Sequence, residues 1–145
     1  MTGRDSRTRL QLIDRDECVR LLAADEIGRL AVNAGHAPTI VPVNYRMDGD
    51  AVVFRTDWGT KLEMGRRAPV SFEIDSFDRE HRTGWSVVVS GRLEEVEVYD
   101  AETYDRVHQL LIDPWAGGEK AHWVRIVPGR ITGRRIGPTP EVPEP

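Results

Sequence analysis

The stretch APTIVPVNYRMDGDAVVFRT, residues 37–56, decides the fold. Its first part, residues 38–47, is rich in β-branched side chains, which favour an extended strand. Asp48-Gly49 is a strong signal for a two-residue turn, and the apolar run of residues 51–56 follows it. The stretch therefore predicts a β-hairpin, and the rest of the chain can be interpreted outward from it.

An anion-binding pattern follows the hairpin in the sequence FRTDWGTKL, residues 54–62. A helix is expected to begin near Thr60, and free N–H groups at a helix start, with the positive end of its dipole, favour an anion. Lys61 adds a full charge, while Thr56 and Thr60 add hydroxyl donors. The expected guest is a phosphate monoester, such as the end of a nucleotide cofactor. The alternative is a solvated helix start, because Gly59-Thr60-Lys61 lacks the spacing of a P-loop.

The remaining elements follow from hydrophobic periodicity and from turn signals. Asp14, followed three residues later by Glu17, resembles the start of a capped helix, so a helix is expected over residues 15–25. Further helices are expected over residues 60–67 and after Asp100, where the last contains Tyr104, Val107, Leu110 and Leu111. Further strands are expected over residues 27–32, 70–74, 85–96, 121–127 and 130–136, with a charged loop over 75–83. Residues 1–12 are expected to be a flexible arm, residues 13–136 the domain, and residues 137–145 a disordered tail.

The order of these elements predicts a mainly β protein with short helices. Strands joined mostly by hairpins favour a small antiparallel barrel. Val87, Val88 and Val89 are apolar at consecutive positions, so both faces of their strand are expected to be buried. One face would fill the barrel, and the other would meet a second subunit or a covering helix.

The composition excludes several classes of protein. The chain has 145 residues, of which 30% are charged and 39% hydrophobic, as expected of one globular domain. It has neither an apolar run of about 18 residues nor the apolar core of a signal peptide, which argues against a membrane span or secretion. The single cysteine, Cys18, fits a cytoplasmic location. The net charge of −4 argues against nucleic acid as a partner, despite the basic residues Arg130, Arg134 and Arg135.

Other motifs exclude further chemistries and point to a planar ligand. The four histidines are not at metal-binding spacing and there is no Cys-x-x-Cys, so no metal site is expected. Neither Ser86 nor Ser90 lies in the nucleophile motif of a hydrolase. The tryptophans lie at strand ends or in loops, where an indole can stack on a planar ligand or simply pack. Trp115 stands out because proline and glycine flank it.

In this order, the segments resemble the pyridoxamine 5′-phosphate oxidase-like family of flavin-binding split barrels. The resemblance covers roughly residues 15–136 and is strongest to the short actinobacterial-type members. It rests on IGRLAV, APTIVPVNYRMDGDAVVFRT, GTKL, VSFEID, GWSVVVSGRLEEV and WVRIVPGRITGRRI.

The resemblance implies an antiparallel split barrel that forms a homodimer and binds FMN, or in some branches a deazaflavin coenzyme, between the subunits. Carried over by position, the residues along the isoalloxazine and ribityl chain are Val41, Pro42, Val43 and Asn44. Those at the phosphate are Arg55, Thr56, Thr60 and Lys61. Polar and aromatic contacts to the flavin would come from Trp85, Ser86 and Trp115, with Trp115 reaching the flavin of the other subunit.

Two departures from the oxidase bear on its reaction. Thr39 stands where the oxidase has an arginine, and residues 121–126 replace its substrate-binding signature. The expected function is therefore an FMN-dependent oxidoreductase that acts on an unspecified small-molecule redox substrate, and no catalytic residue is assigned. The alternatives are a non-catalytic flavin or haem binding or sensing protein and a deazaflavin-dependent reductase.

Overall fold

A computed structural model of the chain describes residues 4–5, 9–33, 37–57, 59, 63, 68–116 and 120–137. The helices are α1 (Arg15–Ala24) and α3 (Ala101–His108). The strands are β1 (Arg4–Asp5), β2 (Leu10–Ile13), β3 (Ile27–Asn33), β4 (Pro38–Asp48), β5 (Ala51–Thr56), β6 (Val70–Asp78), β7 (Thr83–Glu95) and β8 (His122–Ile136). Neither of these helices is both long and apolar enough to cross a membrane.

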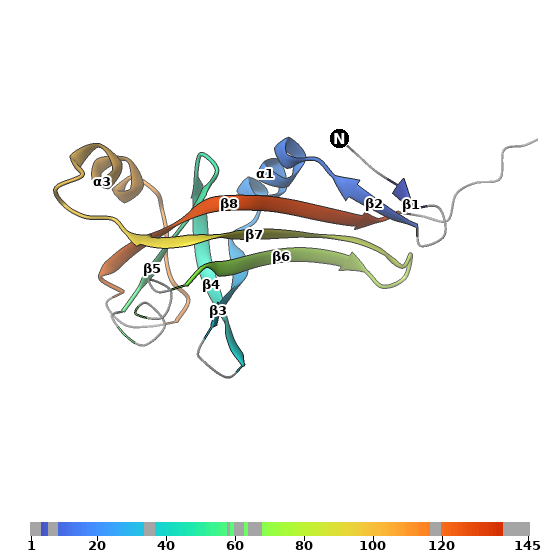
Figure 1. Ribbon diagram of the computed structural model, residues 1–145, viewed down its shortest axis with the longest axis horizontal. Coiled ribbons are helices and arrows are strands. Elements are labelled where there is room, and N and C mark those ends of the chain that lie inside the picture. The colour runs from blue at the N-terminus through green and yellow to red at the C-terminus, as the bar shows by residue number, and fades with distance from the viewer. Residues whose placement is uncertain are drawn as a thin grey trace, which may run out of the picture.

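The described strands form an antiparallel barrel (Figure 1). Six of them follow the order β8-β5-β4-β3-β6-β7, and pairing of β7 with β8 closes the ring. β2 pairs with the C-terminal end of β8, and β1 pairs with β2, so these two strands extend the sheet beyond the ring. This arrangement confirms the predicted mainly β split barrel with short helices.

The hairpin of β4 and β5 forms where the sequence predicted it. Asp48 pairs with Ala51, and Gly49 between them has φ of 62°, a left-handed conformation that glycine adopts without strain. Pairing of the two strands extends from that turn to Tyr45 and Phe54, both of which point into the barrel and are buried.

The barrel interior is filled by alternate residues of each strand. Tyr45 and Phe72 meet edge to face with ring centroids 4.8 Å apart, and Gly28 leaves room for the Phe72 ring. Helix α1 closes one end, with Cys18 and Leu22 fully buried in the same core. Asp14 caps this helix by accepting a hydrogen bond from the N–H of Glu17, as the sequence predicted.

The C-terminal strand corrects one prediction. The sequence favoured two segments, residues 121–127 and 130–136, separated by Pro128-Gly129. The structure has one strand, β8, with a bulge at this point. Gly91 on β7 is essential beside the bulge, because a Cβ atom there would lie 2.1 Å from the carbonyl oxygen of Val127.

Three other expectations differ from the structure. The expected arm, residues 1–12, contains most of β2, which pairs with β8 over Leu10–Ile13. The charged segment 75–83 is not wholly a loop, because β6 continues to Asp78 and its charged side chains alternate with the core positions. Helix α3 ends at His108, so Leu110 and Leu111 follow it, and Leu111 is exposed.

Helix α3 covers the outer side of the barrel at β5 and β8 (Figure 1). Val107 of this helix is buried together with Val53 of β5, Val96 and Ile112. Val53 points away from the barrel interior, since its neighbours Val52 and Phe54 belong to the main core. The β5–β8 side is therefore occupied by the chain's own helix.

Candidate functional site

The candidate site begins where β4 separates from β5. Pairing between these strands stops at Tyr45 and Phe54, so residues 38–44 pair with β3 alone among the described strands. This leaves one backbone edge of β4 open to a ligand that can hydrogen-bond to main-chain groups. The open edge coincides with the segment Val41–Asn44, which the resemblance placed along the flavin.

The four residues of this segment do not all face the same way. Val41 and Val43 pack against the main core, so their side chains are turned into the barrel. Pro42 and Asn44 alternate with them and point outward. A ligand on the outer surface would therefore contact the side chains of Pro42 and Asn44, and only the main chain of the two valines.

Asn44 and Trp115 of the same protomer meet although they are 71 residues apart in sequence, whereas the resemblance had Trp115 reach the flavin of the other subunit. The N–H of Trp115 donates a 2.9 Å hydrogen bond to the side-chain oxygen of Asn44. They lie beside a cavity of about 240 Å³, and the Trp115 indole is 73% exposed. The cavity is lined by Glu26, Asn44, Tyr45, Arg46, Leu111, Ile112, Asp113 and Trp115. An exposed indole beside an open strand edge is suited to stacking on a planar ring.

Arg55 holds the loop that carries Trp115. Its guanidinium donates to the carbonyl oxygens of Ile112 at 3.1 Å and Lys120 at 3.2 Å, and it lies 5.2 Å from the ring centroid of Trp123. These contacts anchor both ends of the segment between residues 112 and 120. The contacts described for Arg55 are thus structural, whereas the resemblance placed it at the phosphate.

A second set of hydrogen bonds holds the same loop. Asp57 accepts hydrogen bonds from the backbone N–H and the side-chain ammonium of Lys120, at 2.8 and 3.1 Å. These hydrogen bonds lower the pKa of the Asp57 carboxyl. Thr56 is only 5% exposed, and its hydroxyl donates to the carbonyl oxygen of Asp57.

Thr60 and Lys61, the other expected phosphate contacts, lie outside the described residues, as do Trp58 and most of the helix expected over residues 60–67. Within that stretch the N–H of Glu63 donates to the carbonyl oxygen of Gly59 at 3.1 Å.

The predicted contacts on β7 lie on another side of the barrel. Trp85 packs against the main core, while Ser86 points outward. In the ring of strands, β7 is three positions from β4 in either direction. Ser86 and Asn44 are therefore on opposite sides of one protomer, so a single bound flavin could contact both only if two protomers contributed.

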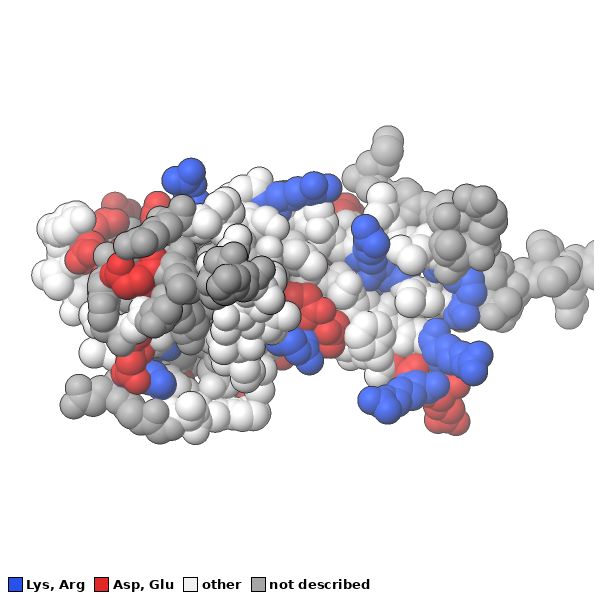
Figure 2. Space-filling model, turned by 60° about the horizontal axis from the view of Figure 1, so that its bottom comes forward, with Lys and Arg blue, Asp and Glu red and all other residues white. Residues whose placement is uncertain are grey.

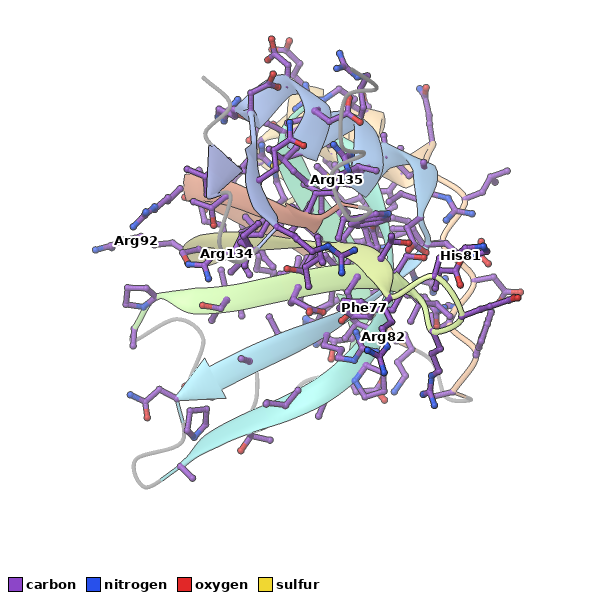
Figure 3. The ribbon with its side chains drawn as sticks, turned by 90° about the vertical axis from the view of Figure 1, so that its right-hand side faces the viewer. Phe77, His81, Arg82, Arg92, Arg134 and Arg135 are labelled. Carbon is purple, nitrogen blue, oxygen red and sulfur yellow. The ribbon has the colours of Figure 1, made fainter. Side chains whose placement is uncertain are left out.

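Ser86 lies in a groove that the sequence reasoning did not identify as a ligand site. The groove has a volume of about 370 Å³ and runs along the outer face of β7 and β8. Its lining consists of Ser86, Val88, Ser90, Arg130, Thr132, Gly133 and Arg134. The alternation of Arg130, Thr132 and Arg134 on one face of a strand was the available signal. Arg135 (Figure 3) is the next residue of β8 but turns to the other side of the strand, where its guanidinium lies 3.7 Å from the Glu17 carboxylate of α1.

A charged cluster occupies the outer face between this groove and β4. Arg29 of β3 contacts both Glu73 at 3.0 Å and Asp75 at 3.1 Å on β6. Partial burial, followed by the neighbouring Asp75, raises the pKa of Glu73 to about 7. One guanidinium therefore serves two carboxyl groups, and the Glu73 carboxyl keeps its proton up to near pH 7.

The chain is similar in both sequence and structure to known proteins. The sequence profile of the family described as pyridoxamine 5′-phosphate oxidase matches residues 14–135. The uncharacterized protein Rv0080 of Mycobacterium tuberculosis is 38% identical over 130 residues, which are 86% of this chain and 84% of that protein.

Two solved structures have the same fold as this chain. An FAD-binding protein of Mycobacterium smegmatis matches with a TM-score of 0.74 and 35% identity, over 86% of this chain and 98% of that one. An FAD-binding protein of Mesorhizobium loti matches with a TM-score of 0.71 and 26% identity, over 87% and 97% respectively.

Proposed function

Because the chain belongs to the pyridoxamine 5′-phosphate oxidase family, we propose that it is a flavin-dependent oxidoreductase of the cytoplasm whose cofactor is held between the two subunits of a homodimer. The observation that carries the proposal is the open edge of β4 at Val41–Asn44, with Trp115 fixed beside it by a 2.9 Å hydrogen bond. The FAD-binding proteins with this fold support a flavin as the guest.

The residues present fit such a cofactor. Main-chain groups of β4 can hydrogen-bond to the polar edge of an isoalloxazine ring, and Trp115 can cover its face. The Asn44 side chain accepts the Trp115 N–H, which leaves its amide N–H₂ available as a donor. Thr60 and Lys61 remain the proposed phosphate contacts, on the sequence argument alone. The FMN moiety is common to FMN and FAD, and we assign the β4 site to this moiety.

The flavin would supply the redox chemistry, and the protein would bind, orient and shield it. Arg55 and Asp57 contribute by holding the loop that carries Trp115, so that the indole is ordered before the ligand arrives. Such preorganisation reduces the conformational entropy lost on binding. The small-molecule substrate would approach the exposed face beside Trp115.

The oxidation of pyridoxamine phosphate is not the proposed reaction. In the segment that departs from the oxidase signature, His122 lies 2.5 Å from Glu95 and Trp123 packs against His108 and Arg55. These residues are therefore engaged in the fold. That observation favours a second candidate, a non-catalytic flavin carrier or sensor that uses the same β4 site.

A titration tests the proposal. The purified chain is stripped of bound ligand and titrated with FMN, FAD and a deazaflavin coenzyme while flavin fluorescence is recorded. Saturable binding of FMN or FAD in the micromolar range is expected, and Lys61→Ala should weaken it by about 1.5–3 kcal/mol, the size of a hydrogen bond to a charged group. Absence of saturable binding of either flavin would refute the proposal. Tight binding of the deazaflavin alone would identify the deazaflavin coenzyme as the cofactor instead.

Turnover separates the two candidates. A flavin-loaded protein that is reduced by NADH, NADPH or reduced deazaflavin, and reoxidised by an acceptor, is an oxidoreductase. A loaded protein that none of these donors reduces would favour the carrier or sensor.

A further inference from the structure

The loop after α3 exposes two large apolar side chains and a carboxylate beside the β4 site. Leu111 is 85% and Trp115 73% exposed, and Asp113 between them is exposed as well. All three line the cavity of about 240 Å³ that also contains Asn44. Exposed apolar side chains that are grouped on a concave surface, rather than scattered singly, mark a place where another molecule binds.

The backbone on either side of Asp113 is anchored. The carbonyl oxygen of Ile112 accepts a hydrogen bond from Arg55, and the N–H of Trp115 is hydrogen-bonded to β4. Pro114 restricts the backbone between these two points. The carboxylate is therefore positioned before a ligand arrives, which reduces the conformational entropy lost on binding.

The charged groups around this cavity favour a cation. The charged residues in its described lining are Glu26, Arg46 and Asp113. Arg46 is paired with Glu26 at 3.4 Å, whereas Asp113 makes no hydrogen bond or ion pair with any residue that the structure describes. A second hollow, of about 470 Å³, shares Glu26 and Arg46 with the cavity and adds Asp25 to its acidic groups. One carboxylate is thus left without a counterion at a place that a ligand can reach.

The charge distribution of the whole molecule acts in the same direction. Figure 2 shows that acidic side chains are more frequent toward the end of the molecule that carries α3, while Lys and Arg side chains gather toward the opposite end. The loop after α3 lies at the same end as the helix (Figure 1). The summed field of such charges raises the local concentration of a ligand of opposite sign.

The size of the cavity and its aromatic wall define the ligand further. Since a cavity of about 150 Å³ can hold benzene, a volume of about 240 Å³ has room for one ring with a short side chain. The face of the Trp115 indole attracts a cation, and Leu111 offers apolar contact. A phosphate or carboxylate group would instead meet the carboxylate of Asp113.

We propose that the cavity beside Trp115 is the substrate site, and that the substrate is a small organic cation with an apolar or aromatic body and no phosphate or carboxylate group. Asp113 is the residue that selects the charge of this substrate. The inference rests on the proposed function and deepens it, because it names the class of the small-molecule substrate. It also gives a physical reason why a phosphorylated substrate is disfavoured at this site.

Three probes that share one ring and differ in charge test the site. Benzylammonium, benzyl alcohol and benzoate are titrated into the full chain, and heteronuclear NMR follows the indole N–H signal of Trp115, which is assigned with Trp115→Phe. Benzylammonium should shift this signal saturably and bind about three- to fivefold more tightly than benzyl alcohol, as expected for one ion pair at an exposed position. Benzoate should bind more weakly than either.

Asp113→Asn should abolish the preference for the cation, because it removes the charge and keeps the shape of the side chain. Asp105→Asn is the matched control and should retain the preference, since Asp105 is an exposed acidic residue of α3 that does not line the cavity. Equal affinity for the three probes, or an undiminished preference in Asp113→Asn, would overturn the inference.

The same titration of the FMN-loaded chain separates this inference from the proposed function. A substrate site remains open beside the cofactor, so benzylammonium should still bind, and loss of its binding in the loaded chain would overturn the inference while leaving flavin binding intact. Absence of flavin binding would refute the proposed function alone, because the titration of the ligand-free chain still decides whether the cavity selects a cation.

Discussion

Replacing Arg55 by alanine distinguishes a structural role, in which the side chain anchors the loop that carries Trp115, from direct contact with a phosphate. If Arg55 holds the 112–120 segment, its loss removes two hydrogen bonds from a charged donor to carbonyl oxygens, at 3.1 and 3.2 Å, and a contact with Trp123. A hydrogen bond that involves a charged group contributes about 1.5–3 kcal/mol. Since water can partly replace the donor at this half-buried position, we expect the free energy of unfolding to fall by about 2–4 kcal/mol.

The assay is urea denaturation of the ligand-free protein at one fixed concentration, followed by hydrogen exchange of the loop. With a slope of about 2 kcal/mol per molar urea, the midpoint should fall by about 1–2 M. Amides of residues 109–116 should exchange faster. Arg15→Ala is the control, because its ion pair with Asp50 is exposed and should contribute less than about 1 kcal/mol. An unchanged midpoint and unchanged exchange, together with weakened flavin binding, would refute the claim that Arg55 anchors the loop. That result would favour direct phosphate binding by Arg55.

Further predictions concern the β7–β8 bulge and the cluster of Arg29, Glu73 and Asp75. Gly91→Ala should lower the free energy of unfolding by about 3 kcal/mol or more, because its Cβ would meet the backbone oxygen of Val127, whereas Gly59→Ala, with no atom within 4 Å, should change it by less than about 0.5 kcal/mol. Equal denaturation midpoints for the two variants would contradict the close approach. Glu73 has a pKa raised from 4.5 to about 7 by burial and by Asp75, so the folded state holds its proton more tightly than the unfolded state does. The resulting stability is fully present below about pH 4.5 and is lost as the pH rises through 7. Between pH 5 and 8 the free energy of unfolding should therefore fall by about 1–2 kcal/mol from this group, discounted because the side chain is 33% exposed. Glu73→Gln should flatten that fall, and an unchanged pH profile in thermal denaturation would contradict the assignment.

Local sequence signals predicted the elements that depend on neighbouring residues. The turn at Asp48-Gly49 and the helix cap at Asp14 both formed as expected, because a few adjacent side chains and one backbone conformation determine them. The extension of β6 over residues 75–78 was missed. These residues remain a strand because they pair with β7, and their charged side chains lie on its solvent side. The local composition does not reveal that pairing.

Less of the candidate site could be predicted, because its parts meet through tertiary contacts. The hydrogen bond between Trp115 and Asn44 depends on a loop that Arg55 anchors from another strand. The inward orientation of Val41 and Val43 follows from strand register, which the resemblance did not specify residue by residue. The position of Ser86 across the barrel from Asn44 emerged only when the ring of strands was known.

A crystal structure of the protein with bound FMN or FAD tests the central claim most directly. We predict that the isoalloxazine ring lies along Val41–Asn44 of one subunit, with Trp115 beside it, at the interface with a second subunit. A flavin bound wholly within one protomer, or bound away from the open edge of β4, would contradict the account.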